Sequence, residues 1–293
     1  MEHAKQPAGS QHRRKSQAKE IWRRMKRNRL AMAGLVMISI LVLMAAFAGV
    51  IADESLALSR SPDRLQGPSA AHWFGTDNLG RDVFARIVHG ARISLTLGIA
   101  TTALSLIIGG LIGAVAGYFG GFIDNVIMRI ADMFMAIPAI LLTLAMIAAL
   151  GTSMTNLIIA TTISNVPGFV RIIRAYILTV IGQEYIEAAK ACGMGDFMII
   201  LRHILPNVIG PIVVEATMTV AGMIISISGL SYLGMGIQPP TPEWGSMLSE
   251  AKDHMIKHPH LVVFPGLFIV LAALSLNLLG DGLRDAIDPR LKD

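Results

Sequence analysis

Residues 183–207 read QEYIEAAKACGMGDFMIILRHILPN and place a polar, glycine-containing segment between two long apolar stretches. The first ten of these residues favour a short helix, which Gly193 and Gly195 then end. Glycine adopts backbone angles that other residues avoid, so the two positions predict a sharp break before a second short helix. Pro206 suits the first turn of a following helix, where the missing N–H costs nothing. The stretch therefore predicts a bent pair of short helices, residues 183–204, held between two long helices.

The two short helices are expected to present different surfaces. Asp196 can cap the second helix, whose apolar residues at positions i, i+3, i+4 and i+7 are expected to share one face. Those residues are Phe197, Ile200, Leu201 and Ile204. The first helix offers a carboxylate and small side chains, Glu187, Ala188 and Ala189, which allow a partner to approach closely. The segment thus predicts a docking site, whereas the alternative, a helix lying in the lipid headgroups, requires more lysines and a larger apolar face.

The composition of the 293-residue chain is that of a membrane protein. Hydrophobic residues make up 53% and charged residues 15%, with a mean hydropathy of +0.59, whereas soluble domains average about 45–50% and about 25%. Six apolar runs are long enough to span a bilayer: 30–52, 93–118, 126–150, 155–175, 205–233 and 261–282. Because a bilayer span must satisfy its backbone internally, we expect an all-α membrane protein with six transmembrane helices. The first run is longer than the apolar core of a signal peptide, so cleavage is not expected.

The distribution of lysine and arginine predicts the orientation of the spans. Ten of these residues precede Leu30, and the positive-inside rule places that segment in the cytoplasm. Threading six spans from there puts 18 of the 25 basic residues on the cytoplasmic side and 7 outside. Both termini and residues 183–204 are then cytoplasmic. Because the rule already explains the basic tail, no nucleic-acid partner is expected.

Small, kinking and charged residues predict how the spans pack. The second span carries glycine at every fourth position, which favours the close approach of another helix. These glycines are Gly109, Gly113 and Gly117. Pro138 predicts a kink in the third span. Arg129 and Asp132 lie three residues apart and are expected to pair with each other, and Asp124 is the alternative partner of the arginine.

Polar residues in the fifth span are candidates for function. Glu215 lies about ten residues into the span, and an intramembrane carboxylate is a functional candidate; the alternative is that it faces water at the inner mouth. Ser226, Ser228 and Ser231 need hydrogen-bond partners and are expected to face the bundle or a polar cavity. A role in a translocation path and simple hydrogen bonding between helices both remain open for them.

The docking segment also carries a family motif. Its residues are Glu187, Ala188, Ala189, Gly193, Leu205 and Pro206. In this order they resemble the EAA motif of type I ABC importer permeases, where the motif forms the coupling helix that docks onto an ATPase subunit. The resemblance therefore implies an ATPase-coupling role for these six residues. His203 departs from the pattern, since the family often has isoleucine there.

Three further stretches narrow the resemblance. They are 72-HWFGTDNLGRDVFARIVHGARISL-95, 229-GLSYLGMGIQPPTPEWGSML-248 and 277-NLLGDGLRDAIDPRL-291. They resemble segments of the dipeptide/oligopeptide/nickel branch, and in particular its second, C-type, permease subunits. Together with the docking segment, the resemblance covers nearly everything from about residue 28 onward.

The resemblance implies a division of the chain. Residues 1–29 form a cytoplasmic basic tail, 30–92 the first transmembrane helix with an external loop, and 93–282 the permease core with coupling helices 183–204. Residues 283–293 form a cytoplasmic C-terminal tail.

The resemblance also implies partners and a place in the cell. These are a second, B-type, permease subunit, two ABC ATPase subunits that bind ATP and magnesium, an external substrate-binding protein, a peptide substrate and the lipid of a bacterial inner membrane. No cofactor, metal site or catalytic residue is expected on this chain. Independently, the phosphate-binding pattern Gly-x4-Gly-Lys-Ser/Thr is missing, because the pair Gly-Lys does not occur in the sequence.

Other classes of function are less well supported by the sequence. An ion-driven secondary transporter favours inverted repeats, and none is evident. A membrane enzyme with a metal site is suggested by His254, His258, His260 and Glu250, but Pro259 interrupts the cluster, and exposed loop histidines are the preferred interpretation. Within the importer class, nickel, glutathione and opines are alternatives to peptides as cargo.

Overall fold

The computed structural model describes residues 17–287, and the expectations for residues 1–16 and 288–293 of the two tails lie outside this part. The described chain is helical, with one isolated bridge between Thr76 and Asp82 and no strand. In order, its helices are α1 Gln17–Met25, α2 Arg29–Ala46, α3 Ala48–Ile51, α4 Glu54–Leu58, α5 Val83–Phe119, α6 Gly121–Met135, α7 Ala139–Leu150, α8 Met154–Leu178, α9 Glu184–Ala191, α10 Asp196–Ile199, a π-helical turn Ile200–Ile204, α11 Leu205–Tyr232, α12 Trp244–Ala251 and α13 His260–Ile287. The all-α prediction is confirmed.

Five helical segments are long and apolar enough to cross a membrane. They are α2, α5, α8, α13 and the continuous segment Asp196–Tyr232, which contains α11. A bent pair, α6 and α7, makes a sixth candidate, with an angle of 81° between its halves. The break falls where Pro138 predicts a kink, and Pro138 is the residue that precedes α7. The third apolar run is therefore not one straight helix.

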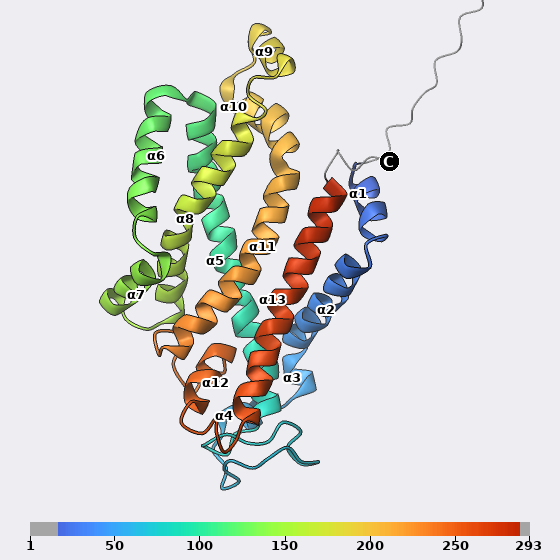
Figure 1. The fold of residues 1–293 in the computed structure, drawn as a ribbon, viewed down its shortest axis with the longest axis vertical. Helices are drawn as coiled ribbons and strands as arrows, with labels where there is room; N and C mark the ends of the chain where they lie inside the picture. Colours follow the sequence, from blue (N-terminus) through green and yellow to red (C-terminus); the bar gives the residue numbers. More distant parts are fainter. Residues whose placement is uncertain (1–16, 288–293) are drawn as a thin grey trace, which may run out of the picture.

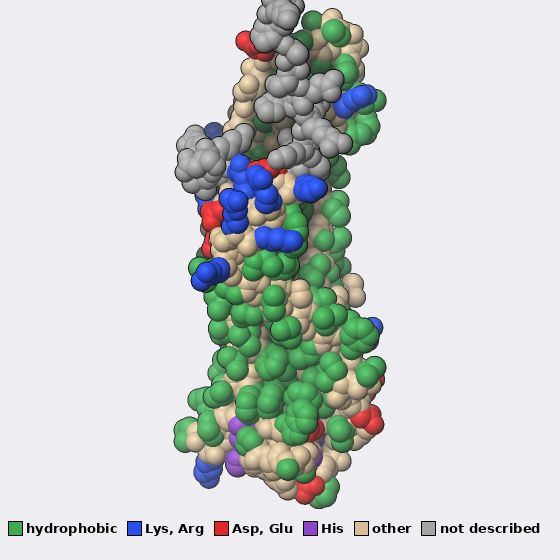
Figure 2. Space-filling model, turned by 90° about the vertical axis from the view of Figure 1, so that its right-hand side faces the viewer, with side chains coloured by type: hydrophobic (Ala, Val, Ile, Leu, Met, Phe, Trp, Pro, Cys, Tyr) green, Lys and Arg blue, Asp and Glu red, His purple; other side chains and the backbone are tan. Residues whose placement is uncertain are grey.

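The long helices run side by side along the longest axis of the molecule (Figure 1). The hairpin of α9 and α10 stands at one end, and α12, α4 and the segment before α5 form the other. The N-terminal helix α1 packs against α13 toward the end that carries the hairpin. Figure 2 shows Lys and Arg side chains gathered toward this end and hydrophobic side chains covering the middle of the face. Such an apolar belt between polar ends is the surface of a membrane-spanning bundle.

The glycine stripe of α5 brings this helix against α8. A Cβ atom on Gly113 would lie 2.6 Å from the backbone oxygen of Val170, and one on Gly109 would lie 2.8 Å from that of Val166. Backbone atoms of a packed helix cannot move aside cheaply, so these positions require glycine. The prediction of close helix approach is confirmed.

Replacing Gly113 by alanine is expected to destabilise the protein by about 1–3 kcal/mol, the usual cost of overpacking. The matched control is Gly110→Ala on the same helix, where an added Cβ meets nothing within 4 Å. Thermal unfolding of the purified protein measures both. A lower Tm for Gly113→Ala alone is the expected result, and equal Tm values for the two variants would contradict the packing.

The ion pairs of α6 differ from the sequence-based expectation. Asp132 pairs with Arg171 of α8 at 2.5 Å, and Asp124 pairs with Arg174 of α8. The predicted pairing of Arg129 with either aspartate is therefore wrong. Both carboxylates bind arginines of α8, and sequence spacing within α6 could not reveal this.

Candidate functional site

Residues 184–204 form a helical hairpin. α9 ends at Ala191, and Gly193 has a φ of +77°, in the left-handed region that favours glycine. The amide of Met194 donates to the carbonyl of Ala189 and closes the helix end. Gly195 has an ordinary φ of −66° and precedes α10. The predicted break between two short helices is confirmed, and it rests on one of the two glycines.

A π-helical turn follows α10 and changes which residues are buried. In a π-helix the hydrogen bonds join residues five apart, and accordingly Ile199 and Ile204 are both buried, at 0% and 1% exposure. Phe197 is 76% exposed and Leu201 51%. The predicted common face of Phe197, Ile200, Leu201 and Ile204 is therefore wrong, because it assumed the α-helical period.

Asp196 also has a different role from the predicted cap. It is the first residue of α10, and its side chain makes no capping hydrogen bond. Instead its carboxylate accepts a hydrogen bond of 2.6 Å from the hydroxyl of Tyr118, near the end of α5. The Lys190 ammonium lies 5.2 Å from the centre of the same aromatic ring. Tyr118 thus ties both arms of the hairpin to α5.

The hairpin is anchored to the bundle by apolar residues. Ile186 of α9 is fully buried and packs in one cluster with Ile204 and with Ile173 and Ile177 of α8. Ala189 is 8% exposed and belongs to the same cluster. The hairpin is therefore packed against α8 and the start of α11.

The predicted coupling residues divide into two groups. Ala189 is buried beneath the hairpin, whereas the other five lie exposed: Glu187, Ala188, Gly193, Leu205 and Pro206. Four exposed apolar side chains accompany them, and we call these the hairpin patch: Tyr185, Phe197, Met198 and Leu201. An exposed apolar group at the tip of a bundle is typical of a protein interaction site.

A largely apolar cavity lies between α7, α8 and α11, and Ser226 lines it. The cavity has a volume of about 280 Å³. Thr143, Ser164 and Asn165 contribute its other polar groups with Thr161. The Thr143 hydroxyl donates to Ser164 at 2.8 Å, which joins α7 to α8.

The other two serines of the fifth apolar run lie elsewhere. Ser228 and Ser231 are 5% and 2% exposed and lie beneath the segment 236–245. A Cβ atom on Gly245 would come within 2.4 Å of the Ser228 carbonyl oxygen. The structure therefore separates these two serines from Ser226.

Glu215 lies apart from Ser226 and from the pair Ser228 and Ser231. It is half-buried on α11. Together with Arg284 of α13, it is close enough to act electrostatically on Tyr176 of α8. It does not line the cavity that contains Ser226.

Glu243 organises the start of α12 and was missed in the sequence. Its carboxylate accepts hydrogen bonds from the amides of Gly245 and Ser246, at 2.9 and 2.7 Å, and from the Ser94 hydroxyl at 3.3 Å. The side chain is fully buried, and this burial raises the pKa of Glu243 above its ordinary value. Glu is not among the residues preferred at a helix N-cap, so the sequence carries no clear signal for this role, and burial depends on packing that sequence does not show.

The raised pKa of Glu243 predicts how stability depends on pH. The folded state binds a proton more readily than the unfolded state, so stability from this group falls as pH rises above about 4.5. Between about pH 5 and about pH 8, the Tm of the wild type should therefore fall relative to that of Glu243→Gln. Glu54→Gln, at an exposed position, is the control. Parallel pH profiles for wild type and Glu243→Gln would contradict the prediction.

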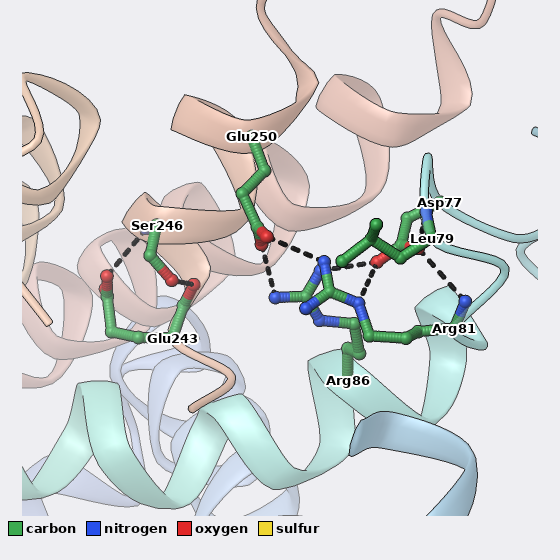
Figure 3. A network of polar contacts seen from close by, with 7 residues as sticks. All are labelled: Asp77, Leu79, Arg81, Arg86, Glu243, Ser246 and Glu250. Carbon is green, nitrogen blue, oxygen red and sulfur yellow. Dashed lines mark hydrogen bonds and ion pairs between the residues drawn. The ribbon is translucent and has the colours of Figure 1, made fainter. Parts of the chain in front are cut away.

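Four charged residues form a buried network next to α12 (Figure 3). Arg81 donates to Asp77 and to Glu250, each at 2.6 Å. Arg86 donates to the same two carboxylates, at 2.6 and 2.5 Å. Both arginines are only 1% exposed, and buried charges require such pairing. The network joins α12 to the segment before α5 and to α5 itself.

The network also bears on the metal-site alternative. Glu250 is bound to two arginines rather than to histidines. Among residues 17–287, no three His, Cys, Asp or Glu side chains gather closely enough to hold a metal ion.

A bundle of long apolar helices with an anchored helical hairpin at one end is the architecture of a membrane protein. Comparison with known proteins gives the family. The model described as "Binding-protein-dependent transport system inner membrane component" matches residues 109–293, and "N-terminal TM domain of oligopeptide transport permease C" matches residues 16–68. The chain therefore belongs to the binding-protein-dependent permease family, whose members are inner-membrane components of ABC importers.

Several curated relatives match nearly the whole chain. A dipeptide transport system permease protein of Alkalihalophilus pseudofirmus is 46% identical over 94% of this chain and 90% of its own length. Glutathione transport system permease proteins of Pectobacterium atrosepticum and Escherichia coli are 44% and 47% identical, over 94% and 93% of this chain and 91% and 90% of their own lengths. These relatives are transport permease subunits rather than enzymes.

Proposed function

We propose that the chain forms half of the translocation path of an ATP-driven importer for dipeptides, beside a second, B-type, permease subunit. The observation that carries the proposal is the exposed hairpin, anchored to α8 and α11 and standing at the end toward which α1 lies (Figure 1). The basic residues of α1 favour the cytoplasm. The chain has no phosphate-binding pattern with which to bind ATP itself. A cytoplasmic hairpin is therefore well suited to dock onto a separate ATPase subunit.

The topology belongs to the same proposal. The chain crosses the inner membrane six times, with the bent pair α6 and α7 as one span and both termini in the cytoplasm. Residues 1–29 and 283–293 are cytoplasmic tails, residues 30–92 hold the first span and an external loop, and residues 93–282 form the permease core. The short helices within residues 183–204 are its coupling helices.

The coupling residues receive separate roles in this proposal. Glu187, Ala188 and Gly193 face the ATPase together with the hairpin patch, and Ala189 packs beneath them. Leu205 and Pro206 begin α11, through which the hairpin is joined to the path. Two ABC ATPase subunits bind ATP and magnesium, and their closure moves the hairpins of the two permease subunits toward each other.

The polar residues of α11 are proposed to serve different parts of the path. Ser226 lines the path at the cavity between α7, α8 and α11. Glu215 lies nearer the cytoplasmic end, and Ser228 and Ser231 lie beneath the external cover formed around α12. An external substrate-binding protein delivers the peptide to that end.

A second cargo, glutathione, is favoured by a specific observation. Relatives named for glutathione transport are 44–47% identical to this chain, as similar as the relative named for dipeptides. Glutathione is itself a small peptide, so the two candidates share backbone amides.

A reconstituted complex tests the proposed function. The complex is purified through this chain, placed in proteoliposomes with its binding protein, and assayed for ATP hydrolysis with dialanine, pentaalanine, glutathione or Ni²⁺. Stimulation by dialanine is expected, and stimulation by glutathione alone would establish the second cargo. If no ATPase subunit co-purifies and no hydrolysis occurs, the proposal is wrong.

Reporter fusions test the topology separately. A reporter fused after residue 293 and one inserted near Ala191 are both expected to report the cytoplasm. The control is a reporter inserted near Gly67, in the exposed external segment, which should report the outside. An external signal at either of the first two positions would overturn the orientation.

A further inference from the structure

Basic side chains cluster where the chain enters its first apolar helix. Residues 17–29 contain one acidic residue, Glu20, and six basic residues: Lys19, Arg23, Arg24, Lys26, Arg27 and Arg29. Figure 2 shows Lys and Arg side chains gathered at the edge of the apolar belt. We propose that this basic surface binds the phosphate headgroup of an anionic phospholipid, at a pocket between α1 and α13. The inference goes beyond the proposed function and requires only that the chain spans a membrane.

The pocket has the chemistry of a phosphate site. It has a volume of about 310 Å³ and lies between α1, the turn that follows α1, and the end of α13. Arg23, Arg24 and Arg27 line it, and Gly282 and Asp285 contribute from α13. A guanidinium group presents its N–H donors in a planar fork that matches the oxygens of a phosphate. Three such groups around one pocket suit the phosphodiester of a lipid headgroup.

The carboxylates of the pocket are already paired. Glu20 pairs with Arg23 at 2.6 Å. Asp285 accepts a hydrogen bond of 3.3 Å from the carboxamide of Asn28. Arg27, by contrast, makes no ion pair with any residue of the described part of the chain. A phosphate that enters the pocket supplies the counterion that Arg27 lacks.

The surroundings of the pocket favour a lipid over a soluble anion. Arg29 is the first residue of α2, and Leu30 beside it is 64% exposed. Trp22 of α1 is 42% exposed, and the Lys26 ammonium lies 5.2 Å from the centre of its ring. Tryptophan is enriched at the boundary between lipid headgroups and hydrocarbon. The basic surface therefore lies at headgroup depth, with apolar groups beside it for the acyl chains.

The two sides of α1 have different environments. Met25 is 5% exposed and packs in one cluster with Ala31 of α2 and Ala286 of α13. Lys19 and Arg27 are exposed. Because the apolar side of α1 is buried within the protein, the helix is held in place without inserting that side into the bilayer. Its basic side chains are left to contact headgroups, and a lipid in the pocket would join α1 to α13.

Fluorescence quenching of Trp22 tests the inference locally, because a brominated lipid quenches a tryptophan that it contacts. The complex purified through this chain in detergent is titrated with brominated phosphatidylglycerol or brominated phosphatidylcholine. The signal of Trp22 is obtained by subtracting that of the Trp22→Phe complex. Half-quenching is expected at an about tenfold lower mole fraction of the anionic lipid than of phosphatidylcholine, because basic residues attract anionic headgroups.

A paired set of variants assigns the binding to the pocket. Arg23→Gln/Arg27→Gln should raise the mole fraction of phosphatidylglycerol needed for half-quenching about tenfold and leave quenching by phosphatidylcholine unchanged. The matched control is Arg60→Gln/Arg64→Gln, which removes two exposed arginines from the external segment and should change neither titration.

Several results would overturn the inference. Equal half-quenching by the two lipids would show no preference for an anionic headgroup, and equal shifts in the two double variants would show only an effect of total charge. Loss of quenching by both lipids in Arg23→Gln/Arg27→Gln would show that the arginines hold α1 in place rather than bind lipid. Displacement of brominated phosphatidylglycerol by equimolar inorganic phosphate would identify a site for soluble anions. None of these measurements requires uptake, so failure of the proposed function leaves the inference standing.

Discussion

Replacing Gly193 by valine is expected to reduce transport about tenfold or more while the protein still inserts into the membrane. Gly193 has a φ of +77°, and a β-branched residue in this region is strained. The strain costs about 1–2 kcal/mol, and each 1.4 kcal/mol corresponds to about a factor of ten in an equilibrium. The hairpin is expected to relieve the strain by changing the angle between α9 and α10, which displaces Glu187 and Ala188 from their docking positions.

The matched control lies two residues away. Gly195 has a φ of −66°, and an added Cβ meets nothing within 4 Å at either glycine. Gly195→Val therefore introduces the same side chain without the same backbone strain. Uptake and binding-protein-stimulated ATP hydrolysis, normalised to the complex recovered from membranes, are the measurements. Similar losses in both variants would show that bulk on the hairpin, rather than its bend, is what matters.

The apolar pattern predicts most of the fold because the signals are local. The hydrophobic residues that predict a span lie within that span, and Pro138 lies at the kink that it predicts. The stripe of Gly109 and Gly113 predicts a close neighbour because only small residues allow backbones to touch. The sequence does not name that neighbour, since a glycine pattern carries no information about the identity of the helix that meets it.

The parts that escaped prediction depend on contacts between distant residues. Asp132 pairs with Arg171, 39 positions away, although Arg129 is nearer in sequence. The π-helical turn after Ile199 changes the period within one helix, and a search for α-helical spacing cannot detect it. Glu250 stands four residues before His254 and suggests a metal site, but folding places it against two arginines.

In the candidate site too, local features could be predicted and features that depend on distant contacts could not. The break at Gly193 was predictable because a single residue type explains it. The cavity between α7, α8 and α11 was not predicted, because its wall combines residues of three helices that lie far apart in the sequence.

The continuous helical segment Asp196–Tyr232 offers a physical connection between the two ends of the molecule. Its first turns belong to the hairpin, its middle carries Glu215, and Ser226 lines the cavity nearer its far end. The π-helical turn Ile200–Ile204 and Pro211 lie between the hairpin and Glu215, and such features are where helices bend. Gly113 and its contact with Val170 hold α5 against α8 beside this segment.

Replacing Arg86 by methionine is expected to destabilise the protein by about 3–5 kcal/mol, because removing one member of a buried ionic group leaves its partners uncompensated. Asp77 and Glu250 would then share Arg81 alone. Arg64→Met, at an exposed position of the same external segment, is the control and should have little effect.

A charge-balanced double variant separates lost charge pairing from lost packing. In Arg86→Met/Glu250→Met, Arg81 and Asp77 remain as a neutral pair, 2.6 Å apart. Replacing buried ion pairs by apolar residues of similar volume is often neutral or stabilising, so the double variant should recover most of the stability lost by Arg86→Met. Thermal unfolding in detergent, with wild type and both single variants, completes the cycle. If the double variant is as unstable as the sum of the single variants, packing of the long side chains rather than charge holds α12 against α5.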